Sequence, residues 1–215
     1  MTSLLSAHLE SFAHAGLPPA LLVCIAVGCY FIGNINPAIL IGKAYGVDVR
    51  SEGSGNAGMT NVMRTVGRKA GIFTFAIDVL KGLLPTLALI HTVGAPFGMM
   101  CGVIVAIGHI WPAVYGLKGG KGVSTCFGVV LAFNAVLALI LIAVVLLCAV
   151  ITKRVSAGTL VACACAAPIA YFMAPMDAPA MLAIAVLVVI SHRANIARLV
   201  KGAEPRMSFG KKDEQ

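Results

Sequence analysis

The first group of residues that could do chemistry is a glycine-rich stretch, GSGNAGMTNVMR, at residues 53–64. Glycine at alternate positions lets successive backbone N–H groups turn toward one anion, because no Cβ obstructs them. Hydroxyl and amide side chains add neutral donors, and a guanidinium adds a two-pronged donor for phosphate. A merely flexible loop would explain the glycines and the serine, but not the asparagines and the arginine. The predicted anion-binding residues are Gly53, Ser54, Gly55, Asn56, Gly58, Thr60, Asn61 and Arg64.

A second group lies in the connection GLKGGKGVST, at residues 116–125, just before an apolar stretch. The pattern predicts a loop whose backbone N–H groups and following helix N-terminus face an anion, with Lys121 neutralising it. It does not match the Walker A pattern, so alone it is weak evidence. His109, upstream of the loop, is either a ligand or an ordinary buried histidine. The glycines concerned are Gly119, Gly120 and Gly122.

The third group, HRANIARLVKGAE at residues 192–204, directly follows the last apolar stretch. If this segment is helical, His192 and Asn195 share one face, and Ile196 and Leu199 point toward the membrane. The competing interpretation is a basic helix that touches anionic lipid. We expect Glu204 to anchor a loop or to pair with an arginine.

Two ionisable residues, Asp78 and Lys81, stand three apart inside an apolar run. Such groups are costly within a membrane and usually face one another or a polar cavity. A structural ion pair is therefore as good a prediction as a substrate contact. Asn34 and Asn36 interrupt an earlier run and are expected to line the same cavity.

The composition indicates that these groups are positioned by membrane helices. Of the 215 residues, 60% are hydrophobic and 11% are charged, whereas about a quarter are charged in soluble domains. The net charge is +8 with only eight carboxylates, which disfavours an all-protein site for Mg²⁺ or Ca²⁺. The basic residues are spread over short connections, which disfavours nucleic acid. We predict neither metal nor cofactor, and we interpret the seven cysteines as small buried hydrophobes.

Apolar runs predict an all-α integral membrane protein, a compact bundle of seven or five transmembrane helices. The runs cover residues 20–41, 71–91, 97–115, 123–151 and 155–190. The last two can each be one helix or two, with breaks near Asn134 and at 173–179. Basic residues lie in alternate connections, which places the N-terminus outside and the C-terminus in the cytoplasm. The expected parts are an external segment 1–19, one catalytic domain 20–200 and a cytoplasmic tail 201–215.

Together the three groups resemble the bacterial acyl-phosphate:glycerol-3-phosphate acyltransferases, in order and spacing, over residues 28–205. Asp78, Lys81 and Gly82 match as well, and Ala57 departs from a frequent proline. The resemblance implies transfer of a fatty acyl group from acyl-phosphate to the 1-hydroxyl of glycerol 3-phosphate. The products would be lysophosphatidic acid and phosphate, in the first step of phospholipid synthesis. It also implies a site on the cytoplasmic face of the bacterial inner membrane, with no need for metal or coenzyme A.

On this interpretation Ser54, Arg64, Lys121, His192 and Asn195 are catalytic. Arg64 and Lys121 hold the two phosphate groups, while His192 and Asn195 orient the attacking hydroxyl or polarise the carbonyl. Either His192 or the substrate's own phosphate takes the proton. Expected partners are the lipid bilayer and a soluble enzyme that makes acyl-phosphate. The rival functions are a transporter of organic anions and a CDP-alcohol phosphotransferase, whose metal-binding aspartate cluster the sequence lacks. The further substrate-binding predictions are Lys81, His109, Glu204 and the asparagine, threonine and glycine residues of the two loops.

Overall fold

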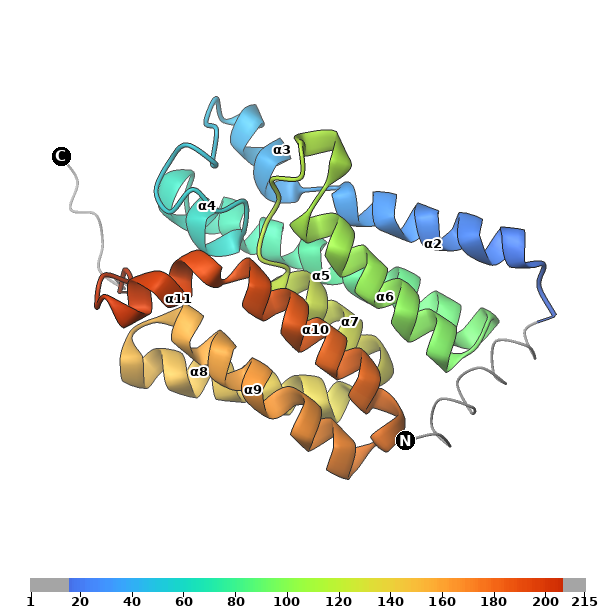
Figure 1. The fold of residues 1–215 in the computed structure, drawn as a ribbon. Coiled ribbons are helices and arrows are strands. Elements are labelled where there is room, and N and C mark those ends of the chain that lie inside the picture. The colour runs from blue at the N-terminus through green and yellow to red at the C-terminus, as the bar shows by residue number, and fades with distance from the viewer. Residues whose placement is uncertain (1–15, 207–215) are drawn as a thin grey trace.

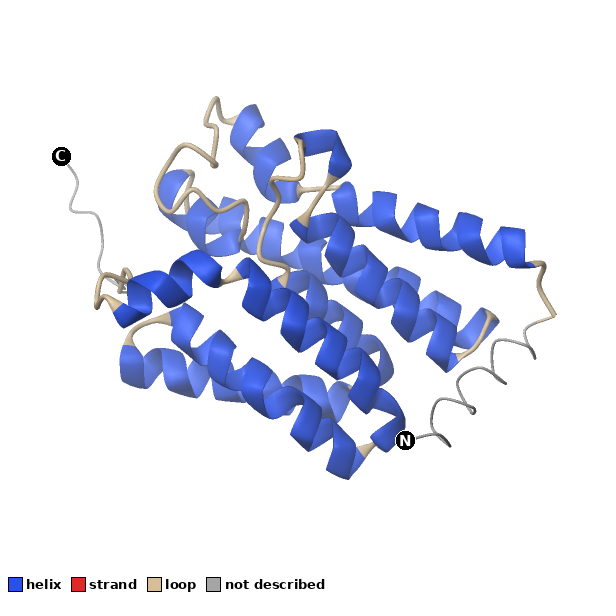
Figure 2. Cartoon of the chain, viewed as in Figure 1, coloured by secondary structure: helices blue, strands red, loops and turns tan. Residues whose placement is uncertain are grey.

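The computed structural model describes residues 16–206, which fold into a bundle of helices (Figure 1). All regular structure in this range is helical, and loops gather at one end of the bundle (Figure 2). The elements are α2 (Pro19–Asn34), α3 (Pro37–Ala44), α4 (Met59–Thr65), α5 (Arg68–Thr92), α6 (Ala95–Ile110), η1 (Ala113–Tyr115), α7 (Val123–Phe133), α8 (Ala135–Thr152), α9 (Val155–Met173), η2 (Pro175–Asp177), α10 (Ala178–Ser191) and α11 (Arg193–Val200).

The outer surface of the bundle is suited to lipid. Large apolar side chains project from it, with Val150 of α8 69% exposed and Phe172 of α9 84% exposed. Within residues 16–206, five stretches are long and apolar enough to cross a membrane, α7 is a shorter apolar helix, and α10 meets α11 at a 62° bend. The predicted all-α integral membrane protein is therefore confirmed. The number of crossings and the sides of the termini stay predictions.

Both long apolar runs are split into two helices. Asn134 separates α7 from α8, and its side-chain oxygen caps α8 by accepting from Leu137 N at 3.0 Å. Its amide donates to Asp177 Oδ2 at 2.8 Å, which joins this break to the one between α9 and α10. The first run is interrupted where the sequence predicts it: α2 ends at Asn34, and Asn36 caps α3 by accepting from Ile39 N.

Small residues allow close helix crossings. α2 packs on α6 where Gly33 meets Gly108, and a Cβ on either residue would collide with the backbone of the other helix. Close backbone approach at small residues is typical of membrane bundles. The Tyr30 hydroxyl pins the chain beyond α6, since it donates to Trp111 O at 2.8 Å and accepts from Ala113 N at 3.0 Å. This contact fixes where the second glycine-rich loop begins.

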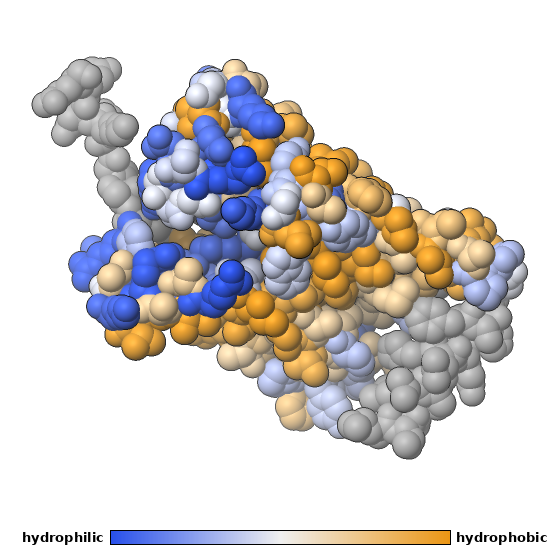
Figure 3. Space-filling view, turned by 45° about the horizontal axis from the view of Figure 1, so that its top comes forward, coloured by the Kyte–Doolittle hydropathy of each residue, from blue (hydrophilic) through white to orange (hydrophobic). Residues whose placement is uncertain are grey.

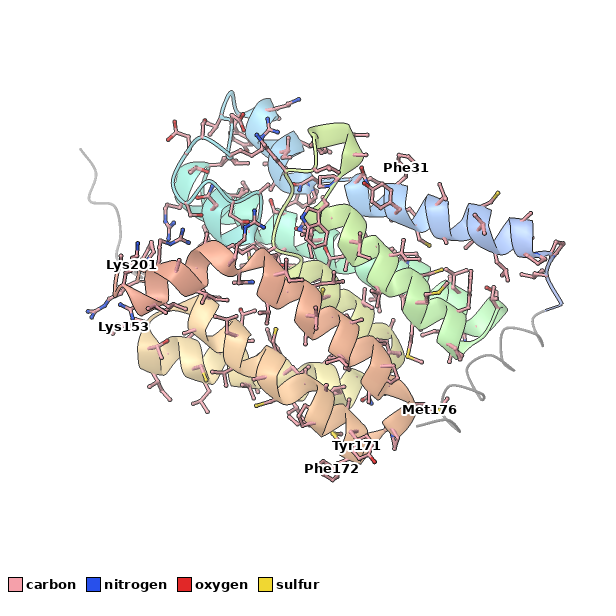
Figure 4. The ribbon with its side chains drawn as sticks, viewed as in Figure 1. Phe31, Lys153, Tyr171, Phe172, Met176 and Lys201 are labelled. Atoms are coloured by element: carbon pink, nitrogen blue, oxygen red, sulfur yellow. The ribbon has the colours of Figure 1, made fainter. Side chains whose placement is uncertain are left out.

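The bundle has a polar end and an apolar end. Lys153 and Lys201 lie at the end that carries α11, whereas Tyr171, Phe172 and Met176 lie at the opposite end (Figure 4). Hydrophilic residues gather over the region of α3, α4 and α11 (Figure 3). The three polar segments singled out in the sequence therefore meet at one end, as the distribution of basic residues predicts.

Candidate active site

The loop before α4 is held together by the amide of Asn61. Its Oδ1 accepts from Ser54 N at 2.8 Å and from Ser54 Oγ at 3.1 Å. Its Nδ2 donates to the carbonyls of Val49 and Glu52 at 2.7 and 3.0 Å. These four bonds use both donors and both lone pairs of the amide. Asn61 is therefore a positioning residue, which corrects the expectation that it donates to a substrate.

Three of the backbone N–H groups in the predicted nest bond within the protein. The N–H of Ser54 binds Asn61, the N–H of Gly55 donates to Glu52 O at 2.9 Å, and that of Gly58 donates to Asn56 O at 3.0 Å. Gly53 has a φ of 59°, and a Cβ there would collide with Asn61 Oδ1, so glycine is required for the loop's path. The N–H groups of Asn56, Ala57, Met59 and Thr60 have no partner within residues 16–206, so anion binding by this loop stays a prediction.

Arg64 is the available cation of the first loop. It is exposed at the end of α4 and lines a polar hollow of about 650 Å³ together with Asp48, Glu52 and Thr65. Among the described residues it has no hydrogen-bond or ion-pair partner, and the side chains of Asn56 and Thr60 have none either. These three side chains stay candidates for substrate contact.

The Gly119–Gly122 loop folds back on the end of α6. The N–H of Gly119 donates to Ile110 O and that of Gly120 donates to His109 O, both at 3.2 Å. These two N–H groups are therefore not available to an anion, contrary to expectation. The N–H groups from Lys121 to Thr125 have no partner among residues 16–206, and they form the N-terminus of α7. Such a helix terminus favours an anion, so these N–H groups, rather than those of Gly119 and Gly120, are the candidates for anion binding.

Lys121 meets the third polar segment. Ser191 Oγ lies 3.0 Å from Lys121 O and 2.7 Å from Val188 O, so its one hydrogen is shared between the second loop and the end of α10, next to His192. Burial lowers the pKa of Lys121 to about 8; attraction to Glu204 opposes this shift, and repulsion by Arg198 adds to it. Lys121 is thus a half-buried ammonium group with His192, Glu204 and Arg198 around it.

His192 is buried, and the hydrogen-bond partner of its Nδ1 atom shows which ring nitrogen carries the hydrogen. Its Nδ1 lies 2.8 Å from Val188 O, and a carbonyl can only accept, so Nδ1 carries the hydrogen. The Nε2 atom is then a lone-pair acceptor, and no described residue donates to it. The neutral ring can therefore accept a proton or a hydroxyl hydrogen through Nε2.

Glu204 holds the tail against α9 and α11. Its carboxylate accepts from Ser156 Oγ at 2.6 Å, from Asn195 Nδ2 at 2.5 Å and from Arg198 Nε at 2.7 Å. Burial opposes its ionisation, but these donors outweigh that effect and hold the pKa of the carboxyl below its ordinary value. The expected pairing of Glu204 with an arginine is confirmed. Asn195 Oδ1 is buried without a partner in the described range.

Asp78 and Lys81 are buried, and they contact each other rather than the exposed loops. Lys81 Nζ lies 2.7 Å from Asp78 Oδ1, 2.7 Å from His109 Nδ1 and 2.6 Å from Ile35 O. The predicted ion pair between Asp78 and Lys81 is confirmed. Lys81 also binds the carbonyl of Ile35, which lies at the break between α2 and α3. No hydrogen bond in the described residues joins Asp78 to His192, so a Ser54/His192/Asp78 triad is not formed.

An apolar cavity of about 80 Å³ lies between α7, α8, α9 and α10. It begins at Val123, two residues beyond Lys121, and at Val188, four residues before His192. Ala162, Ala166 and Met181 line it deeper in the bundle. The polar residues thus lie directly next to a space that only a hydrocarbon group would fill favourably.

Comparison with known proteins decides the family. The sequence profile described as Glycerol-3-phosphate acyltransferase matches residues 23–202. The chain belongs to this family. It is 42% identical to the glycerol-3-phosphate acyltransferase of Clostridioides difficile over 201 residues, covering 89% of this chain and 97% of the relative. It is also 42% identical to that of Trichlorobacter lovleyi over 184 residues, with 83% and 94% covered.

Solved structures of this family have the same fold. The glycerol 3-phosphate form of PlsY (YgiH), an integral membrane glycerol 3-phosphate acyltransferase, superposes with a TM-score of 0.83 at 34% identity, covering 87% of this chain and 96% of that one. Its lysophosphatidic acid form gives 0.81 at 33%, with 87% and 95% covered. The predicted family is confirmed, as are its membrane character and its place in acyl transfer to glycerol 3-phosphate.

The structure adds two residues that sequence reasoning missed in this acyltransferase. Ser156 binds Glu204, and Ser191 binds the Lys121 carbonyl. The only signals were a serine at the start of an apolar run and a serine next to His192. Each joins segments far apart in the chain, so the tertiary fold alone reveals them.

Proposed function

We propose that this protein moves a fatty acyl group from acyl-phosphate to the 1-hydroxyl of glycerol 3-phosphate, giving lysophosphatidic acid and inorganic phosphate. One observation carries the proposal: the half-buried Lys121 at the N-terminus of α7 stands two residues before Val123, which lines the apolar cavity between α7 and α10. An anion site continuous with an alkyl site suits a donor that is an acyl chain joined to a phosphate. Membership of the glycerol-3-phosphate acyltransferase family supports the acceptor.

The donor phosphate binds at Lys121 and the free N–H groups of α7, and Arg64 holds the phosphate of the acceptor. The mixed anhydride has a good leaving group, so positioning and charge stabilisation supply most of the catalysis. Lys121 neutralises the phosphate as it departs. The acyl chain extends into the cavity lined by Ala162 and Ala166.

The acceptor hydroxyl is oriented by His192 and Asn195, whose Nε2 and Oδ1 atoms are unpartnered acceptors in the described residues. The hydroxyl oxygen attacks the acyl carbonyl carbon, and the bond from that carbon to the phosphate oxygen breaks with its electron pair leaving on phosphate. The hydroxyl proton passes to His192 Nε2 or to a phosphate oxygen. Ser54 acts through Asn61 by holding the loop that carries Arg64.

We place the site at the cytoplasmic face of the inner membrane, because the basic connections gather at that end. Acyl-phosphate is short-lived and lipophilic, so a soluble enzyme that makes it would deliver it best by docking at this basic face. Neither metal nor coenzyme A has a role in the proposed reaction.

The test is phosphate release by the purified, detergent-solubilised protein given palmitoyl-phosphate and EDTA, with and without glycerol 3-phosphate. Release that needs glycerol 3-phosphate and survives EDTA is the expected result. Alanine at Arg64 or Lys121 should lower the rate at least about a hundredfold, the scale for loss of a group that stabilises the transition state. Lys118→Ala and Arg68→Ala, exposed neighbours of each, are the matched controls. No release from folded protein would rule out the donor.

A further inference from the structure

The buried group formed by Asp78, Lys81 and His109 has a hydrogen-bond arrangement that determines the protonation of the histidine. Lys81 Nζ has two hydrogen-bond partners, Ile35 O at 2.6 Å and His109 Nδ1 at 2.7 Å, and it forms an ion pair with Asp78 Oδ1 at 2.7 Å. A lysine ammonium has three N–H donors and no lone pair, so it can only donate. His109 Nδ1 must therefore be the acceptor in its contact with the Lys81 ammonium.

The charge balance supports the ammonium form. Side-chain exposure is 5% for Lys81 and 2% for Asp78, so an unpaired carboxylate would be strongly disfavoured at this depth. A charged lysine cancels the carboxylate, whereas a neutral amine would leave it alone. His109 Nδ1 also lies 3.3 Å from Asp78 Oδ1, a contact that carries no hydrogen when Lys81 donates to Nδ1.

The tautomer places an N–H donor beneath the second loop. A neutral imidazole whose Nδ1 accepts must carry its hydrogen on Nε2. Nε2 lies under Gly120, because a Cβ on Gly120 would collide with both Nε2 and the carbonyl oxygen of Ala57. This is the seam between the Gly119–Gly122 loop and the loop of residues 53–58. The His109 side chain is 4% exposed, and no described residue accepts a hydrogen bond from Nε2.

We infer that the Asp78–Lys81 ion pair holds His109 as the Nε2–H tautomer, so that an uncharged N–H donor serves a phosphate oxygen bound at the seam between the two glycine-rich loops. Lys81 and Asp78 are then positioning residues, and His109 is the contacting one. This inference rests on the proposed function only in taking phosphate as the ligand of that seam. It makes His109 the counterpart of His192, which carries its hydrogen on Nδ1 and presents a lone pair instead.

The chemistry explains why a neutral donor is useful there. Lys121 already supplies a cation for the departing phosphate, and a second cation would hold the product phosphate more tightly. A neutral N–H donor orients the phosphate without adding charge. Because Lys81 donates to Nδ1, protonation of His109 to the imidazolium is opposed, and the ring stays a donor on one side only.

The first test is nuclear magnetic resonance of the detergent-solubilised protein labelled with ¹⁵N at its five histidines. Long-range proton–nitrogen correlations distinguish the two tautomers, and His109→Gln and His192→Gln assign the two signals. We expect His109 as Nε2–H and His192 as Nδ1–H. A Nδ1–H tautomer or an imidazolium at His109 overturns the inference, and this readout needs no turnover.

The second test adds inorganic phosphate to the same sample. The His109 Nε2 signal should move on saturation, whereas the signal of His91, in the last turn of α5 and far from the loops, should not. A stationary His109 signal with phosphate bound elsewhere overturns the contact with phosphate. Failure of palmitoyl-phosphate turnover with a moving His109 signal would instead count against the proposed donor.

A variant separates positioning from folding. In Lys81→Met, Asp78 is the remaining neighbour of Nδ1, so His109 should switch to Nδ1–H and lose its donor at the seam. We expect KM for palmitoyl-phosphate or the Kd of phosphate to rise about tenfold, the value of one hydrogen bond. The exposed lysine variant Lys43→Met should leave both values unchanged. A folded Lys81→Met protein with the original tautomer and unchanged affinity would refute the role of Lys81. If this variant fails to fold, the tautomer of His109 in the wild type tests the inference.

Discussion

Activity should fall as pH rises through about 8, because the phosphate site depends on a lysine that burial makes easy to deprotonate. With a pKa of about 8 for Lys121, about nine-tenths of these side chains carry charge at pH 7 and about one-tenth at pH 9. If only the ammonium form stabilises the leaving phosphate, kcat/KM should fall about tenfold across this range. The direction follows from the sign of the group, since a lysine is cationic below its pKa and neutral above it.

The surrounding groups keep a constant charge over the same range. The Glu204 carboxyl has a pKa below its ordinary value and stays ionised, and burial lowers the pKa of His192 to about 4, so its ring is neutral above pH 7. The second ionisation of a phosphate monoester, near pH 6, is also nearly complete. Lys121 is thus the group near the site that titrates between pH 7 and pH 9.

The assay is the initial rate of phosphate release at low substrate concentration, which reports ionisations of the free enzyme, with uncatalysed hydrolysis subtracted at each pH. Lys121→Arg is the matched variant, because a guanidinium stays charged throughout. It should be slower than the wild type at pH 7 but flat up to pH 9. A wild-type profile that is flat to pH 10, or an equal decline in Lys121→Arg, would refute the assignment.

Three further predictions follow from the packing. Asn61→Leu leaves the four partners of the amide unsatisfied and should lower the free energy of unfolding by about 2–4 kcal/mol, measured by thermal unfolding in detergent against Thr60→Val. By the same measurement, Glu204→Ala should lower the free energy of unfolding by about 2 kcal/mol. This value is moderate because Arg198 is 36% exposed, so water replaces part of its ion pair with Glu204. A loss equal to that of the exposed control Glu52→Ala would contradict the role of Glu204 in holding the tail. Ala162→Phe fills the apolar cavity and should reduce turnover of palmitoyl-phosphate more than that of octanoyl-phosphate, whereas Ala164→Phe, on the exposed face of α9, should affect neither; equal losses on both donors would argue against an acyl chain in the cavity.

The fold class could be predicted because bilayer constraints act on local sequence. Long apolar runs must become helices to satisfy their backbone groups, and Asn134 and the prolines after Met173 mark where two runs break. Asn34 and Asn36 likewise predict an interruption of the first run. The structure breaks it there, since Asn36 caps a new helix and Ile35 O accepts from Lys81.

The residue types of the site could be predicted, but not the use of each hydrogen bond. A glycine-rich loop has the same composition whether its N–H groups face an anion or its own carbonyls. Here Gly55, Gly58, Gly119 and Gly120 donate within the protein, and in the second loop the N–H groups without a partner in the described residues begin at Lys121. Ser156 and Ser191 could not be predicted, because their partners lie 48 and 70 residues away in the chain.

The predicted site residues are of two kinds, according to whether their donors and acceptors already have partners inside the protein. Asn61 and Glu204 are occupied by partners inside the protein, so their substitution should lower stability before it changes chemistry. Arg64, His192 and Asn195 each keep an unpartnered donor or acceptor within residues 16–206, two of them in buried positions where such a group is costly. A fold retains that cost where a substrate supplies the missing partner. Arg64→Ala should therefore lose turnover while keeping the stability of the wild type, whereas an Asn195 variant also loses the bond to Glu204 and should lose part of both.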